Sequence, residues 1–207
     1  MRSLTAEEIN SLYDFIDKVI GTLNRRFIAL FNRLKSLKNE DEIIEAVNIL
    51  YAEIDKITRD YLLLIARKVY KLLSEDDDDI VEDFITLAWI NRALKGYDPV
   101  TKYVYTHEVD RKRTRLIETL IASDDKPKEV ETAKRLWSKQ AAQYADNIAL
   151  KAATTAYEKN GINEVIWVTE QDSRVCKICR DRDGVRYRLE NVPVRPHYGC
   201  RCWLRTV

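Results

Sequence analysis

Apolar residues in the first 160 positions recur every three to four residues, which is the spacing of one face of an α-helix. Glycine and proline rarely interrupt this pattern, so it predicts long helices. The first helix is expected to start at a capping box formed by Thr5 and Glu8. Its apolar positions alternate by four and three, as in a coiled coil or a long helical hairpin. They are Ile9, Tyr13, Ile16, Ile20, Leu23, Phe27, Leu30 and Leu34.

A second apolar run follows after a short break at residues 37–40, so the two helices are expected to fold back as an antiparallel pair. Its members are Val47, Leu50, Ile54, Ile57, Tyr61 and Leu64. Three more helices are predicted at about residues 80–94, 107–122 and 128–159, with a loop from Gly96 to Tyr105. The acidic stretch 75–79 suits the positive end of the helix dipole that follows it, while a metal or basic-partner site is the less favoured alternative.

Residues 161–207 have a different pattern, with β-branched and aromatic residues that alternate along the chain. Residues 165–169, 184–189 and 200–205 are predicted to form three short strands joined by polar turns. The predicted fold class is therefore α+β, with a long helical N-terminal region followed by a small three-stranded β module stapled by Cys and His residues. The expected organisation is a helical region at 1–125, a long connecting helix at 126–160 and the β module at 161–207.

Charge and composition narrow the functional classes. The 207 residues include 35 Lys and Arg against 34 Asp and Glu, so the chain lacks the large basic excess of a typical nucleic-acid-binding protein. With 45% hydrophobic residues it also lacks the signature of a disordered chain. Residues 1–8 do not resemble a signal peptide, and the longest aliphatic run, residues 62–66, is too short to cross a bilayer. We therefore expect a protein made and kept in a reducing cytoplasm.

The sharpest chemical signal is a cluster of cysteine and histidine near the C-terminus. Its spacing is Cys176-x2-Cys179, seventeen further residues, then His197-x2-Cys200-x-Cys202. Two such closely spaced pairs match the layout of small structural zinc sites. The pattern favours a zinc ion held by Cys176, Cys179, His197 and one of Cys200 or Cys202. Disulfides in a mature extracellular particle and unliganded buried thiols remain alternatives.

A catalytic role for these residues is weaker. A Cys-x2-Cys redox centre normally opens a helix within a βαβ unit, and no such pattern surrounds Cys176. His107 and His197 are the only histidines that could serve a cysteine nucleophile as base, and His107 is expected at a helix start. Asp181 and Asp183 lie in an Asp-Gly turn. No enzymatic activity is predicted.

The C-terminal residues resemble the signature of phage head morphogenesis proteins of the Mu F type. The resemblance rests on residues 167–179 (WVTEQDSRVCKIC), the Asp-Gly pair at 183–184 and residues 196–202 (PHYGCRC). Two departures concern the proline, which here precedes His197 instead of following it, and an Arg-Thr-Glu sequence that has no clear counterpart at 144–150.

The resemblance implies a minor capsid protein, present in few copies at the portal vertex or capsid interior. Such a protein would enter the procapsid with the portal protein and other capsid or scaffold components, and act in assembly, DNA packaging or DNA ejection. It would reside in the virion, and in the host cytoplasm during assembly. Neither a membrane nor a small-molecule substrate is implied.

The alternative is a nucleic-acid-binding zinc module that contacts packaged double-stranded DNA. Its phosphate-binding candidates are Arg186, Arg188, Arg201 and Arg205, with Arg180, Arg182 and Arg195 as further members. Tyr187 or Trp203 would stack on bases, although Trp167 and Trp203 are more simply core or interface residues.

Overall fold

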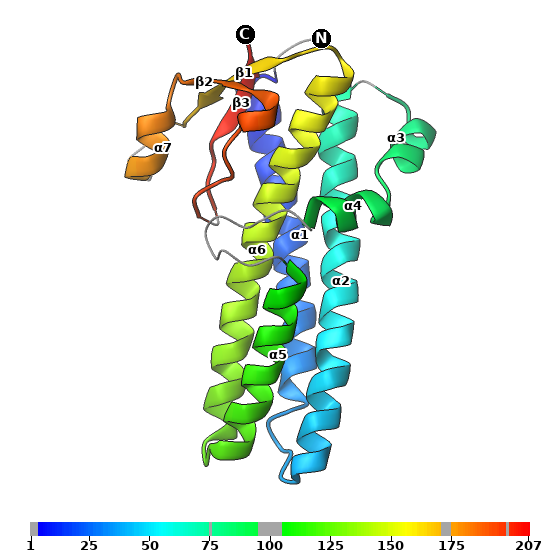
Figure 1. The fold of residues 1–207 in the computed structure, drawn as a ribbon, viewed down its shortest axis with the longest axis vertical. Helices are drawn as coiled ribbons and strands as arrows, with labels where there is room; N and C mark the ends of the chain where they lie inside the picture. Colours follow the sequence, from blue (N-terminus) through cyan, green and yellow to red (C-terminus); the bar gives the residue numbers. More distant parts are fainter. Residues whose placement is uncertain (1–3, 75, 95–104, 171–174, 198) are drawn as a thin grey trace.

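The computed structural model describes residues 4–74, 76–94, 105–170, 175–197 and 199–207. Within these residues, long helices form an elongated bundle, and a small three-stranded sheet lies at the end of the bundle that also holds the N-terminus (Figure 1). This arrangement confirms the predicted α+β class. Among the described residues, no helix combines the length and the apolar character needed to cross a membrane.

The N-terminal hairpin consists of α1 (Ala6–Asn32) and α2 (Glu40–Ser74). The capping box is present as predicted, because Thr5 accepts from the Glu8 amide and Glu8 accepts from the Thr5 amide. Helix α1 runs away from the sheet end, α2 returns, and the two pack against each other (Figure 1). The predicted antiparallel pair is therefore confirmed.

The buried face of α2 departs from the predicted heptad after Ile54. Leu64 is 49% exposed, while Thr58 and Leu62 are buried instead. A straight helix has 3.6 residues per turn, so a strict seven-residue pattern drifts off its buried face along a helix of 35 residues. Positions eleven apart stay on that face. The buried sets are Ile43, Ile54 and Ile65, then Val47, Thr58 and Val69, then Tyr51, Leu62 and Leu73.

The single helix predicted over 80–94 is wrong, because the structure contains α3 (Asp78–Phe84) and α4 (Leu87–Leu94). Asp77 caps α3, which accords with the favoured interpretation of the acidic stretch. The break follows because Arg67 of α2 donates to the Ile85 carbonyl and Thr86 accepts from the Trp89 amide at the start of α4. Apart from Tyr105, the predicted loop at 96–105 lies outside the described residues.

Helix α5 (Tyr105–Ala122) runs down the bundle and α6 (Lys126–Lys159) returns to the sheet (Figure 1). Both start two residues earlier than predicted. Helix α6 packs against α1, α2, α4 and α5, and its alanine-rich stretch is buried on almost every side from 141 to 157. Small side chains allow this close approach, so α6 lies at the centre of the bundle.

The sheet has the order β2–β1–β3 and is antiparallel throughout. Its strands are β1 (Glu164–Val168), β2 (Arg186–Arg188) and β3 (Trp203–Thr206), with α7 (Lys177–Arg182) and a 3₁₀ turn at Leu189–Asn191 between them. Val165, Trp167 and Leu204 are buried in the same hydrophobic core as the helices. The core therefore continues from the bundle into the sheet.

Candidate metal centre

Cys176 and Cys179 lie at the start of α7. Cys176 is the N-cap residue of this helix, and its sulfur lies 3.4 Å from the backbone nitrogen of Cys179. The structure has a short helix here, and its first turn brings positions i and i+3 together. Cys179 is buried and Cys176 is half-buried, so the pair faces inward from the edge of the sheet region.

His197, Cys200 and Cys202 lie on the segment that leads into β3. The sequence predicted a strand from residue 200, but β3 begins only at Trp203. Gly199 has a φ of +70°, and its amide donates to Asp146 of α6 at 2.8 Å. Cys200 and Cys202 therefore lie in a turn and a short connecting stretch, and not in a paired strand as predicted. Both are buried.

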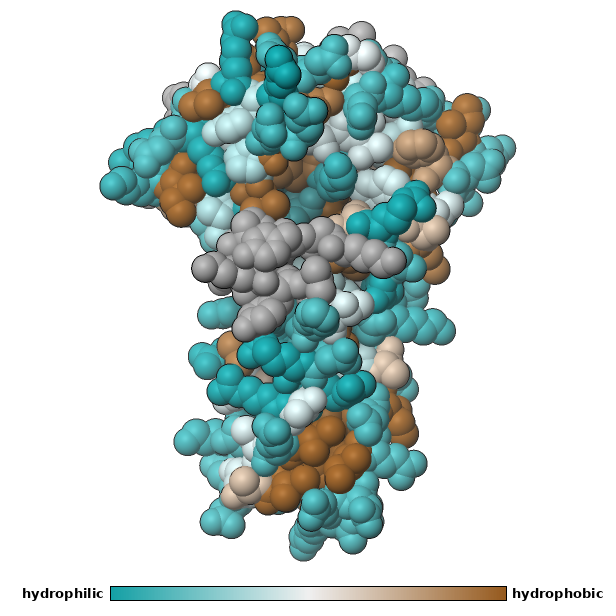
Figure 2. Space-filling model, in the orientation of Figure 1, coloured by the Kyte–Doolittle hydropathy of each residue, from teal (hydrophilic) through white to brown (hydrophobic). Residues whose placement is uncertain are grey.

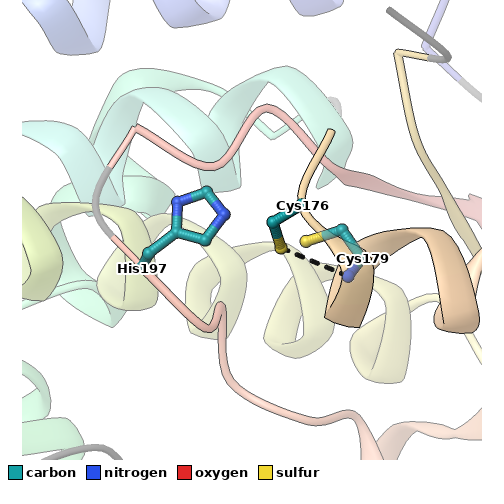
Figure 3. A group of neighbouring side chains, drawn as sticks. All are labelled: Cys176, Cys179 and His197. Carbon is teal, nitrogen blue, oxygen red and sulfur yellow. Dashed lines mark hydrogen bonds between the residues drawn. The ribbon is translucent and has the colours of Figure 1, made fainter. Parts of the chain in front are cut away.

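The five residues form two overlapping groups that share Cys179. The ligand atoms of Cys176, Cys179 and His197 lie within 4.8 Å of one another, and so do those of Cys179, Cys200 and Cys202. Figure 3 shows the His197 ring directed toward the two sulfurs of α7 from the separate C-terminal segment. All five residues line one cavity of about 80 Å³.

The thiols of this cluster influence one another electrostatically. A hydrogen bond with Cys202 lowers the pKa of Cys200 against its burial, and the nearby Arg195 guanidinium favours the thiolate further. The same contact with Cys200, together with burial, raises the pKa of Cys202, and burial raises the pKa of Cys179 to about 12. The thiols of Cys179 and Cys202 therefore favour their protonated forms, and a bound cation would deprotonate whichever of them it ligates.

The arrangement fits a tetrahedral ion that prefers sulfur and nitrogen. Bonds of 2.3 Å to thiolates at a tetrahedral angle place two sulfurs about 3.8 Å apart, and Cys179 Sγ lies 3.5 Å from Cys200 Sγ. Both groups offer only Cys and His donors, which suit zinc better than magnesium or calcium. All four cysteines are free thiols in the structure.

Of the four main arginines predicted to bind nucleic acid, three lie on one face of the sheet and the fourth packs against α1. Arg186 and Arg205 both pair with Ile166 across β1, and Arg188 pairs with Glu164, so the three share one face of the sheet. All three are exposed. Arg201 instead lies over the Tyr13 ring at 5.4 Å.

Arg195 cannot contact a phosphate, because its side chain is completely buried. Its inclusion among the phosphate-binding candidates is therefore wrong. This burial could not be predicted from the sequence, because the charged partner that permits it, Asp146, lies 49 residues away.

Other candidates have structural placements. The predicted Asp-Gly turn is present, with Gly184 at a φ of +74° and the Val185 amide donating to the Arg182 carbonyl at 3.0 Å. Asp183 accepts from the Thr169 amide at 2.8 Å and so joins this turn to the end of β1. His107 lies in the first turn of α5, as expected. Trp167 and Trp203 are buried, as expected for core residues.

Helix α6 carries a polar face that was not predicted from the sequence. Gln143, Asp146 and Asn147 contact the segment that carries three of the five Cys and His residues. Their spacing of i, i+3 and i+4 places them together on one side of a helix. This cluster of polar residues within an alanine-rich stretch could have been noticed in the sequence. The segment that it contacts could not have been predicted from the same pattern.

Comparison with known proteins gives one match. The family model described as phage Mu protein F like protein matches residues 104–205, a range that includes α5, α6, the sheet and the whole Cys/His cluster. Searches of curated proteins and of solved structures found no match. Over residues 104–205, the chain matches the phage Mu protein F-like family of phage head morphogenesis proteins.

Proposed function

We propose that this chain is a minor head protein that acts with the portal protein during procapsid assembly, DNA packaging or DNA ejection. The observation that carries the proposal is the family match over residues 104–205. The proposed role is structural and not enzymatic. Its proposed location is the virion, at the portal vertex or in the capsid interior, after assembly in the host cytoplasm.

The surface of the bundle supports a role in assembly. Figure 2 shows hydrophilic residues over most of one face, with a hydrophobic patch toward the end opposite the sheet. Exposed apolar side chains of the bundle include Ile28 of α1, Ile49 of α2 and Ile121 of α5. Grouped apolar surface is typical of contacts with other proteins, here other capsid or scaffold components.

The proposed role of the Cys/His cluster is to hold a structural zinc ion. Cys176, Cys179 and His197 would supply three ligands, and Cys200 or Cys202 the fourth. Cys200 is favoured, because its sulfur lies beside that of Cys179 and its thiol is the more readily ionised of the two. Zinc would join α7 to the C-terminal segment at 195–204, and these two parts are separate in the chain.

Native mass spectrometry tests both parts of the proposal. The chain would be co-expressed with the portal protein encoded beside it and purified without chelator. The expected result is a complex of the two proteins with one zinc mass on each copy of this chain. Recovery of the chain alone under conditions where the portal protein is folded would contradict the assembly role, and a metal-free mass would contradict the zinc centre.

Contact with packaged double-stranded DNA is a second candidate, favoured by the shared exposed face of Arg186, Arg188 and Arg205. Replacing all three with Gln should reduce the dependence of DNA affinity on salt by a log–log slope of about 3, roughly 0.9 per phosphate contact. Arg25, Arg33 and Arg135, which are also exposed, provide a matched triple Gln control. Equal slopes in the two variants would contradict a DNA contact at the sheet.

A further inference from the structure

We propose that Tyr13, Asp146 and Arg195 are positioning residues for the metal centre. They fix the segment that carries His197, Cys200 and Cys202 onto α1 and α6, so that metal binding also locks the start of α1 to the C-terminus. This inference rests on the proposed zinc centre and deepens it, because it assigns the centre a mechanical link to the helical bundle.

The C-terminal segment is attached to the bundle through its backbone. Side chains of α1 and α6 bond to backbone groups before, between and after its three candidate ligands. At Arg195, the backbone amide donates to Asn147 Oδ1 at 3.1 Å and the carbonyl accepts from Gln143 Nε2 at 2.9 Å. The Gly199 amide donates to Asp146 Oδ2 at 2.8 Å. The Tyr13 hydroxyl donates to the Cys202 carbonyl at 2.8 Å, and the Tyr157 hydroxyl donates to the Leu204 carbonyl at 3.0 Å. The position of each ligand is thus set by the helices.

A buried ion pair lies at the centre of these contacts. Arg195 is 0% exposed and Asp146 is 4% exposed, and their closest atoms are 3.4 Å apart. The guanidinium also lies 5.6 Å from the Tyr13 ring and 5.4 Å from the Trp203 ring, and one of its nitrogens donates to Tyr13 Oη at 3.5 Å. Charges buried to this extent persist only when they are paired, and they serve better to fix one arrangement than to add stability.

The other two ligands have a separate support. Helix α7, which carries Cys176 and Cys179, is followed by the Asp183 turn, which bonds to the end of β1, and Arg182 donates to the Val194 carbonyl at 2.9 Å. The centre therefore has two halves, one supported mainly by the sheet and one by the bundle, with the Arg182–Val194 hydrogen bond between them. A metal ion bridging them would join α1, α6 and the sheet, in the way that second-shell contacts orient metal ligands in other proteins.

Two substitutions test this role in the full-length protein. Tyr13→Phe removes only the hydroxyl that bonds to Cys202 O, and Asp146→Ala removes both the ion pair and the acceptor of the Gly199 amide. Each should lower zinc affinity about 10- to 100-fold, measured by competition with a chromogenic chelator. Asp146→Asn keeps an acceptor for Gly199 and should recover part of the loss. The Co²⁺-substituted variants should show an altered visible absorption spectrum.

Matched controls separate positioning from general stability. Tyr105→Phe alters another buried phenol, one that packs against Trp137 and Tyr144, and Asp14→Ala alters an exposed aspartate of α1. Neither should change zinc affinity. If Asp146→Ala fails to fold, Tyr13→Phe decides the result.

Hydrogen exchange provides the readout that a purely structural role would not change. Removing zinc from the wild type should speed amide exchange in residues 6–23 of α1, and in Tyr13→Phe the same treatment should have much less effect there. Unchanged zinc affinity in both variants, or exchange in α1 that ignores zinc, would overturn the inference while leaving the zinc centre in place. A wild-type chain that binds no zinc would overturn the centre and this inference together.

Discussion

The helical bundle and the β module at residues 161–207 are held by different kinds of contact. In the bundle, apolar side chains meet along whole helices, as where Trp137 packs between Tyr51 and Tyr105. In the β module, the short strands add a few large side chains to the same core, among them Trp167, Trp203 and Leu204. Hydrogen bonds from side chains of the helices to the backbone of the module provide further attachment. The module therefore depends on a small number of specific groups.

Because of this difference, the two regions should respond differently to the loss of a single contact. A helix interface shares its stability over many similar contacts, so one loss is felt in proportion to the volume removed. A region attached by a few polar bonds, together with the proposed metal ion, can lose its arrangement when one of them is removed. The following predictions test that contrast.

Trp137→Ala should have the largest effect on the bundle. The side chain is fully buried, so its loss should reduce the free energy of unfolding by about 3–5 kcal/mol, measured by urea denaturation followed by far-UV circular dichroism. Leu136→Ala, at a side chain 42% exposed, is the control and should cost less than about 1 kcal/mol. Similar losses in the two variants would show that the bundle core is not packed as described.

Cys179→Ser should have the next largest effect, which is a loss of zinc and of stability in the β module. Cys179 belongs to both ligand groups, so bound zinc should fall to near zero. A ligand present at 1,000 times its Kd contributes about 4 kcal/mol, which corresponds to a Tm decrease of about 8–16 °C for a chain of this length.

Ile178→Ser, at a side chain 51% exposed on the same helix, is the control for this substitution and should retain zinc. Hydrogen exchange after zinc loss should rise first in residues 175–182 and 195–204, while the α2–α5 interface stays protected. Uniform exposure of the whole chain would contradict the contrast between the two regions.

Tyr157→Phe should have an intermediate effect. It removes the hydroxyl that donates to the Leu204 carbonyl of β3 at 3.0 Å, and a buried bond of this kind contributes about 1–2 kcal/mol. Chemical denaturation would measure the loss, and faster exchange should be confined to β3 and β1. A loss spread over α1 and α2 would indicate that the hydroxyl is not a local attachment.

Two glycine substitutions should give the smallest effects, with opposite signs. Gly161 ends α6 with a φ of +74°, so Gly161→Ala should destabilise by about 1 kcal/mol. Gly21 lies within α1, where an added Cβ would meet nothing nearer than Arg25 at 3.9 Å, so Gly21→Ala should stabilise by up to about 1 kcal/mol. Thermal unfolding would compare them, and equal signs would contradict the left-handed conformation at Gly161.

Features that depend on neighbouring residues could be predicted from the sequence alone. The Thr5–Glu8 cap, the hairpin, the stop at Gly161, three short strands and the set of five Cys and His candidates depend on periodicity and spacing within a few residues. The family resemblance was visible for the same reason, because its signature is a local order of residues.

Contacts between distant segments could be identified only from the tertiary structure. The buried face of α2 follows its neighbours and not a strict heptad, and Ile85 interrupts a helix because Arg67 binds its carbonyl. Arg195 is buried because Asp146 and Tyr13 lie beside it, although they are 49 and 182 residues away along the chain. Such contacts leave no periodic trace in the sequence, since each depends on where the whole chain brings two groups together.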